Sequence, residues 1–190
     1  DVTATTGGIT DSGTQEITGV TTLVAGSTND ITLNTSTNNF AAAVVITSGR
    51  NVAIIDENAI DLGAATVSGT YDVTATTGGI TDSGTQEIAG VTTLAAGSGN
   101  DITLNTSTNN FADAVVITSG KDVTLVDEHT IVLGAATVSG TYNVTATTGG
   151  ITDSGTQEIA GVTTLVAGSG NDITLNTSTN NFADEVRITS

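Results

Sequence analysis

Apolar residues occur along this chain in short runs, each introduced by an acidic or amide residue. The recurring element is Asp or Asn, then Val or Ile, then Thr or Ala. It begins at Asp1, Asp30, Asn51, Asp72, Asp101, Asp122, Asn143 and Asp172. The intervals are 29, 21 and 21 residues, and the series then repeats. We interpret each interval as one turn of a β-solenoid, in which every strand pairs in parallel with its counterpart one turn later.

A longer period of 71 residues contains this shorter one. Residues 1–71 return as 72–142 with 12 differences, and 143–190 repeat the first part of the unit with 4 differences from the second copy. We predict an all-β, right-handed parallel β-helix with about three turns per repeat. Repeat 1 (1–71), repeat 2 (72–142) and an incomplete repeat 3 (143–190) form one continuous solenoid, which we expect to be an excerpt of a longer chain.

Differences between the copies predict which side chains face solvent. Arg187 stands where the other copies have Val45 and Val116, so this position is expected to face outward. Its neighbours in the first copy, Val44 and Ile46, should then face the core.

The same reasoning applies to Asp61, which a valine replaces in the second copy. It directs Ile60 and Leu62 inward. The pattern leaves open which residue is buried in the pairs Ile54-Ile55 and Leu125-Val126.

Each 21-residue turn is expected to hold three short strands, in the first such turn Asp30 to Leu33, Asn39 to Phe40 and Val44 to Thr47. The 29-residue turn needs an added strand or a bulge within residues 7–20. The Phe residues recur once per copy, about three turns or ~14 Å apart, so we expect no aromatic stacking. The Tyr residues, one per full copy, are expected to lie equally far apart.

The composition supports strands and excludes several functions. Gly numbers 23, and Pro, Cys, Met and Trp are absent. The formal charge of -17 repels phosphate backbones and anionic lipids, so neither nucleic-acid binding nor membrane insertion is expected. Without cysteine there are no disulfides, thiolate metal sites or thiol nucleophiles.

The repeated Asp and Asn residues are the most site-like pattern in the sequence. Stacked turns would place successive carboxylates ~4.8 Å apart. Bridging Ca²⁺ could relieve their repulsion. The alternative, which we favour, is that each side chain accepts a backbone N–H hydrogen bond and solvent screens the rest. No cofactor is expected otherwise.

Other motifs have ordinary explanations. The segments 97–104 and 168–175 resemble one nonapeptide of the calcium-binding RTX toxins, but we favour a Gly-rich turn that leads into a strand. The Thr-rich segments resemble ice-binding arrays without their regularity. N-glycosylation patterns begin at Asn34, Asn105, Asn176 and Asn143. The single histidine, His129, corresponds to an asparagine, so we expect no enzyme activity and assign no catalytic, cofactor or metal residue.

Four segments carry a resemblance to a known family: 8–13, 20–26, 29–33 and 63–69. The chain resembles the filamentous haemagglutinin class of giant bacterial surface proteins. This resemblance implies a long right-handed parallel β-helix that is secreted and used in adhesion, aggregation or contact with other cells.

The sequence thus predicts the structural shaft of a long extracellular or cell-surface fibre, a bacterial adhesin without catalysis. Its expected partners are adjacent repeats of the same chain, other copies end to end, or another cell surface. Two alternatives stay open: a repeat module that binds a cation, a glycan or ice, and a biofilm matrix fibre subunit.

Overall fold

The computed structural model describes residues 1–189, and these residues form β-strands and no helix. The strands are β1 (Val2–Thr3), β2 (Ile9–Thr10), β3 (Glu16–Ile17), β4 (Thr21–Val24), β5 (Ile31–Leu33), β6 (Asn39–Phe40), β7 (Val44–Gly49), β8 (Val52–Asp56), β9 (Ile60–Val67), β10 (Tyr71–Ala75), β11 (Ile80–Asp82), β12 (Gln86–Ile88), β13 (Thr92–Ala95), β14 (Ile102–Leu104), β15 (Asn110–Phe111), β16 (Val115–Gly120), β17 (Val123–Asp127), β18 (Ile131–Val138), β19 (Tyr142–Ala146), β20 (Ile151–Asp153), β21 (Gln157–Ile159), β22 (Thr163–Ala167), β23 (Ile173–Thr174), β24 (Asn181–Phe182) and β25 (Val186–Thr189). They wind into a parallel β-solenoid, as predicted, and the coil has about nine turns. The right-handed sense of the coil stays a prediction.

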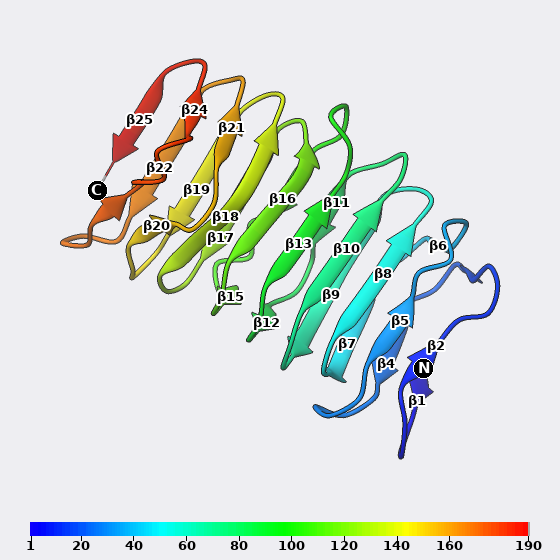
Figure 1. Ribbon diagram of the computed structural model, residues 1–190. Helices are drawn as coiled ribbons and strands as arrows, with labels where there is room; N and C mark the ends of the chain where they lie inside the picture. Colours follow the sequence, from blue (N-terminus) through cyan, green and yellow to red (C-terminus); the bar gives the residue numbers. More distant parts are fainter. Residues whose placement is uncertain (190) are drawn as a thin grey trace.

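Two long parallel sheets form the sides of the coil (Figure 1). One follows the order β1-β4-β7-β9-β11-β14-β17-β19-β22-β25, and the other follows β2-β5-β8-β10-β13-β16-β18-β20-β23. The chain crosses between them at each corner, so strands within these two sheets pair with strands of the preceding and following turns. The shorter strands β12 and β15 extend the first sheet, β21 and β24 extend the second, and β3 pairs with β6.

Each 71-residue repeat occupies three and a half turns. Thr21 corresponds to Thr92 in repeat 2 and to Thr163 in repeat 3. Seven steps along one sheet lead from β4, which holds Thr21, through β7, β9, β11, β14, β17 and β19 to β22, which holds Thr163. The strand of repeat 2, β13, lies in the other sheet. Two repeats therefore make seven turns, and successive repeats present the same residues on opposite sides of the coil.

The extra half turn corrects the interpretation of the 29-residue interval as a single turn. From Asp1 to Asp30 the chain passes from the first sheet through β2, β3 and β4 to β5 in the second sheet, which is one and a half turns. The expected added strand is present, because both β2 and β3 lie within residues 7–20. The 21-residue interval from Asp30 is one turn, since Ile31 pairs with Val52.

The predicted alternation of inward and outward side chains is confirmed. Val44 and Ile46 are buried while Val45 between them is half-exposed, and Ile60 and Leu62 are buried on either side of Asp61. In the two pairs that the pattern left open, the first residue of each, Ile54 and Leu125, is the buried one.

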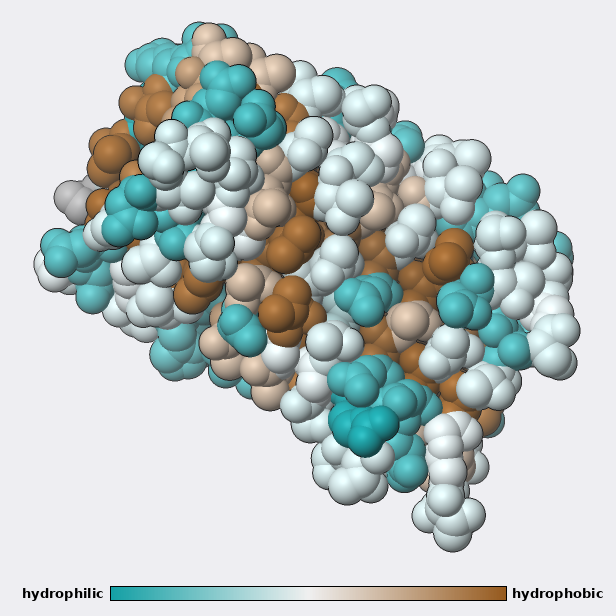
Figure 2. All heavy atoms as spheres, in the orientation of Figure 1, coloured by the Kyte–Doolittle hydropathy of each residue, from teal (hydrophilic) through white to brown (hydrophobic). Residues whose placement is uncertain are grey.

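Aliphatic side chains stack through the centre of the coil. One such column runs Val73, Leu94 and Ile117, each at most 1% exposed. The rings of Tyr71, Tyr142, Phe40 and Phe111 are also buried, and Phe182 is half-buried. The two Tyr rings do not stack, because Tyr71 lies in one sheet and Tyr142 in the other. Figure 2 shows that the visible face is covered largely by weakly polar and hydrophilic residues, with hydrophobic residues visible between them.

Glycines allow the turns to approach at one corner. The Gly90 N–H donates to the carbonyl oxygen of Gly69 one turn earlier at 3.1 Å, and a Cβ on Gly90 would lie 2.6 Å from that oxygen. Gly161 and Gly140 repeat this contact on the opposite side. A side chain here would separate the two turns, so the corner needs glycine.

Candidate functional site

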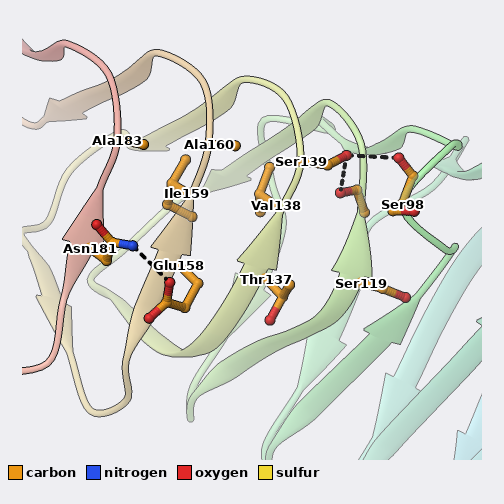
Figure 3. Close-up of a pocket in the computed structure, with 11 residues that line it drawn as sticks. Ser98, Ser119, Thr137, Val138, Ser139, Glu158, Ile159, Ala160, Asn181 and Ala183 are labelled. Atoms are coloured by element: carbon orange, nitrogen blue, oxygen red, sulfur yellow. Dashed lines mark hydrogen bonds between the residues drawn. The ribbon is translucent and has the colours of Figure 1, made fainter.

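An open groove lies at the junction between successive repeats, and it occurs twice. The groove of about 300 Å³ at the second junction is shown in Figure 3. A groove of about 290 Å³ at the first junction is lined by Thr66, Val67, Ser68, Glu87, Ile88, Ala89, Asn110 and Ala112, and the residues 71 positions later all line the other groove. Because a repeat adds half a turn, the two grooves lie on opposite sides of the coil.

Three strands in register build each groove. At the second junction β18, β21 and β24 align Thr137 with Glu158 and Glu158 with Asn181, all three exposed. Between these side chains and the next corner lie Ile159, which is buried, and Ala160, which is exposed. Since the strand β18 belongs to one repeat and β21 and β24 to the next, neither repeat forms the groove alone.

A tight turn forms the opposite wall of the groove (Figure 3). Ser139 at the corner donates its hydroxyl hydrogen bond to the carbonyl oxygen of Ser98, two turns earlier, at 2.7 Å. Ser68 makes the same bond to Ser27 at the first junction. The wall is therefore held by a bond that spans two turns.

Glu158 and Glu87 are the only ionisable side chains that line these two grooves. The Asn181 amide donates to Glu158 Oε2 at 3.0 Å, and the Asn110 amide donates to Glu87 Oε2 at 3.2 Å. Among residues 1–189, no ion pair involves either glutamate. Each groove thus combines an uncompensated carboxylate, an amide, several hydroxyls and an apolar floor.

The predicted continuous ladder of Asp and Asn side chains is wrong. The half turn breaks it into pairs on alternating sheets, Asp30 with Asn51 and then Asp101 with Asp122. Asp72 lies opposite Ala53, two residues out of register. Among residues 1–189 this series therefore forms separate pairs and not one line, and bridging Ca²⁺ stays a prediction.

Hydrogen bonds and cations stabilise these pairs, in line with the backbone hydrogen bonds we favoured. Asp30 accepts the Asn51 N–H at 3.2 Å, and Asp122 accepts the Thr141 N–H at 2.8 Å. Arg50 binds Asp30 through two hydrogen bonds of 2.8 Å. The sequence alone did not lead us to the pairing of Arg50 with Asp30. A signal was present, because Lys121 replaces Arg50 in repeat 2 and both repeats therefore keep a cation next to the Asn or Asp residue.

These contacts lower carboxyl pKa values on the surface. The Arg50 guanidinium and the Asn51 N–H lower the pKa of Asp30 to about 2. The Thr141 N–H and the Lys121 ammonium lower the pKa of Asp122 to about 2. Both carboxylates are therefore ionised in the folded protein near neutral pH.

A second set of acidic residues is structural. Asp82 accepts the Asn109 amide at 2.7 Å and the backbone N–H groups of Asn105 and Thr106 in the turn after β14. Asp127 is fully buried and accepts the N–H of Phe111 at 2.7 Å, while its burial raises its pKa. Since their oxygens already hold the backbone of neighbouring turns, these residues organise loops.

The three repeats have a counterpart among known families. A family model described as repeats of unknown function (DUF5649) matches residues 1–47, 49–118 and 120–189. The chain belongs to this family. No curated protein and no solved structure matches the chain. The match establishes a tandem repeat and does not single out the filamentous haemagglutinin class, so this resemblance stays a hypothesis.

The remaining sequence motifs of the DUF5649 chain occupy separate places in the coil. The RTX-like segment from Gly97 is a tight turn, with Gly97 at φ 79° and its carbonyl accepting the Asn100 N–H, followed by β14. His129 is exposed next to Asp127. Over residues 1–189, His, Cys, Asp and Glu side chains form no group of three or more that could hold a metal.

The exposed Thr positions of the DUF5649 chain do not form a uniform row. Thr32 lies opposite Ala53, and Thr124 opposite Asn143, in the outward-facing register. The sequons at Asn34, Asn105 and Asn176 lie exposed, whereas Asn143 lies within β19. In the described part of the chain, no helix has the length and apolar character needed to cross a membrane.

Proposed function

We propose that this DUF5649 array is the shaft of a long extracellular or cell-surface fibre of bacterial origin, without catalysis. The observation that carries the proposal is the unbroken parallel ladder, which runs through both junctions between repeats. No flexible linker separates the repeats, so added repeats lengthen one rigid body.

The core supports this mechanical role. Consecutive turns bury aliphatic columns such as Val73, Leu94 and Ile117, and each fully buried side chain contributes about 1.5–3 kcal/mol. The contribution recurs in every repeat, because the repeats supply nearly the same core residues. A shaft of this kind gains stability and length together.

The surface charge supports a shaft that stays separate from its neighbours. The three cationic side chains, Arg50, Lys121 and Arg187, all form ion pairs with nearby carboxylates. The net charge of -17 is therefore carried by carboxylates distributed along the coil, and this repels parallel shafts.

The proposal is tested by length. Proteins with three, five and seven repeats should grow by ~17 Å per repeat in small-angle X-ray scattering, since three and a half turns rise ~4.8 Å each. A flexible string of repeats would instead show a maximum dimension that grows irregularly and a scattering curve typical of a flexible chain. That result would overturn the shaft.

A biofilm matrix fibre built from stacked chains is the second candidate, because the parallel ladder that joins consecutive turns within this chain has the geometry that joins separate chains in such fibres. Core residues such as Ile117 and Val73 are 1% exposed because neighbouring turns cover them, and turns of a second chain would cover an exposed end in the same way.

The adhesin role rests on the filamentous haemagglutinin resemblance. It requires a receptor-binding surface in addition to the shaft. Binding of the purified repeats to cells, compared with a shaft whose grooves are altered, tests whether that surface lies within the array.

A further inference from the structure

The groove at each repeat junction has the chemistry of a receptor for a long cationic side chain. Its apolar floor exposes Ala160 and Ala183. Ile159 and Val138 lie beneath them and are only 2% exposed, and a single carboxylate, Glu158, stands at the edge of the groove (Figure 3). Lys and Arg side chains have the matching form, an aliphatic stem with a charged end.

Charge favours a cationic occupant over other classes. The chain carries 20 acidic and 3 basic residues, and the basic ones are already paired within the chain. The carboxylates of Glu87 and Glu158 each bond one amide and have no cation among residues 1–189. A basic partner would find an attractive potential along the whole coil and an unpaired carboxylate in each groove.

The burial of the aromatic rings disfavours a glycan. Tyr71, Tyr142, Phe40 and Phe111 are at most 1% exposed and face the core. Phe182 in β24 is half-buried against the core and does not line the groove. The grooves therefore offer no exposed ring on which a sugar face could stack. Their apolar floor is aliphatic and suits a methylene chain.

The spacing of the grooves sets how a partner could bind. Successive grooves lie on opposite sides and are separated by ~17 Å along the axis, so grooves on one side recur every ~34 Å. A basic segment that reached two grooves on one side would need at least about ten extended residues. Partners could also occupy both sides of one shaft at once.

We propose that each repeat junction is a binding site for a Lys or Arg side chain of a basic, flexible polypeptide partner, and that the shaft displays these sites on two opposite sides. The stem lies on the aliphatic floor, and the cation pairs with Glu87 or Glu158. This inference goes beyond the shaft function, which requires no ligand.

The test uses the 190-residue protein and an oligolysine peptide in isothermal titration calorimetry at low and at physiological salt. The groove variant carries Glu87→Gln and Glu158→Gln, which preserve size and remove both groove charges. The control variant carries Glu57→Gln and Glu128→Gln, which remove the same charge from equivalent positions outside the grooves. We expect affinity for the groove variant to fall about two- to fivefold further than for the control.

A second variant separates the groove from general charge attraction. Ala89→Leu with Ala160→Leu fills both floors and leaves the net charge unchanged; these positions are exposed, and Thr18 occupies the equivalent place in repeat 1. We expect it to weaken oligolysine binding while circular dichroism and scattering length stay as in the parent protein.

Equal loss in the groove and control variants would overturn the proposal, because it would show binding to the overall charge. Full affinity after filling the grooves would overturn it as well. Saturable binding of a neutral oligosaccharide, with oligolysine binding insensitive to both groove variants, would assign the grooves to a different ligand. None of these outcomes would affect the length test of the shaft.

Discussion

The half turn in each repeat can be measured with two spin labels. Thr22 and Thr164 are equivalent residues two repeats apart, and both lie half-exposed on the outer side of the same sheet. Cysteines at both positions would be the only ones in the chain. Seven turns at ~4.8 Å place them ~34 Å apart, whereas three whole turns per repeat would place them ~29 Å apart.

Double electron–electron resonance resolves this difference of one turn when the same spin label is attached at every position. The matched pair, Thr22→Cys with Thr93→Cys, spans one repeat. The distance between these two labels combines a rise of ~17 Å along the axis with the ~10 Å between the two sheets, so we expect a label-to-label distance of at least ~20 Å. A distance near ~14 Å for this pair, together with ~29 Å for the first, would refute the half turn and place equivalent residues on one side.

Four further outcomes are expected. Leu94→Ala should lower the free energy of unfolding by about 2–5 kcal/mol in urea titrations, because Leu94 is buried in the core. Thr93→Ala, on the outer face, should change it by less than about 0.5 kcal/mol, and similar values for both variants would contradict the assigned core. Val116→Arg should leave the midpoint of unfolding nearly unchanged, because Arg187 occupies that place in repeat 3, and Ile117→Arg should prevent folding; a folded Ile117→Arg protein would show the reverse orientation. Asp122 has a folded pKa of about 2, below its ordinary value of 3.8, so its contribution to the free energy of unfolding is present above pH ~4 and is lost as pH falls toward 2. Asp122→Asn, which places the residue of repeat 1 at this position, should therefore reduce the dependence of the free energy of unfolding on pH between ~4 and ~2. An unchanged pH dependence would argue against a stabilising role of the Asp122 carboxylate. Sedimentation should show association that rises with concentration, and Ile188→Lys should reduce it; a parent protein that stays monomeric throughout would exclude end-to-end stacking.

Much of the coil could be predicted from residue spacing, because stacked turns force equivalent side chains to recur. The 21-residue step from Asp30 to Asn51 gave one turn correctly, and the replacement of valine by Arg187 gave the outward face. The 29-residue interval was misinterpreted. Spacing alone does not distinguish an insertion within one turn from an additional half turn that moves the chain to the other sheet.

The groove could not be predicted in the same way. It joins Thr137 of one repeat to Glu158 and Asn181 of the next, and none of these residues is unusual for an exposed strand. Only the pairing of strands across the junction brings them together. The ion pairs were closer to prediction, because Arg50 and Lys121 preserve a cation beside a changing Asn or Asp.

The half turn also couples the number of repeats to orientation. Inserting or deleting one repeat would rotate everything beyond it by half a revolution about the long axis, whereas a change of two repeats would restore the original heading. The parity of the copy number, and not only the reach, would then decide which way any domain carried at the far end points.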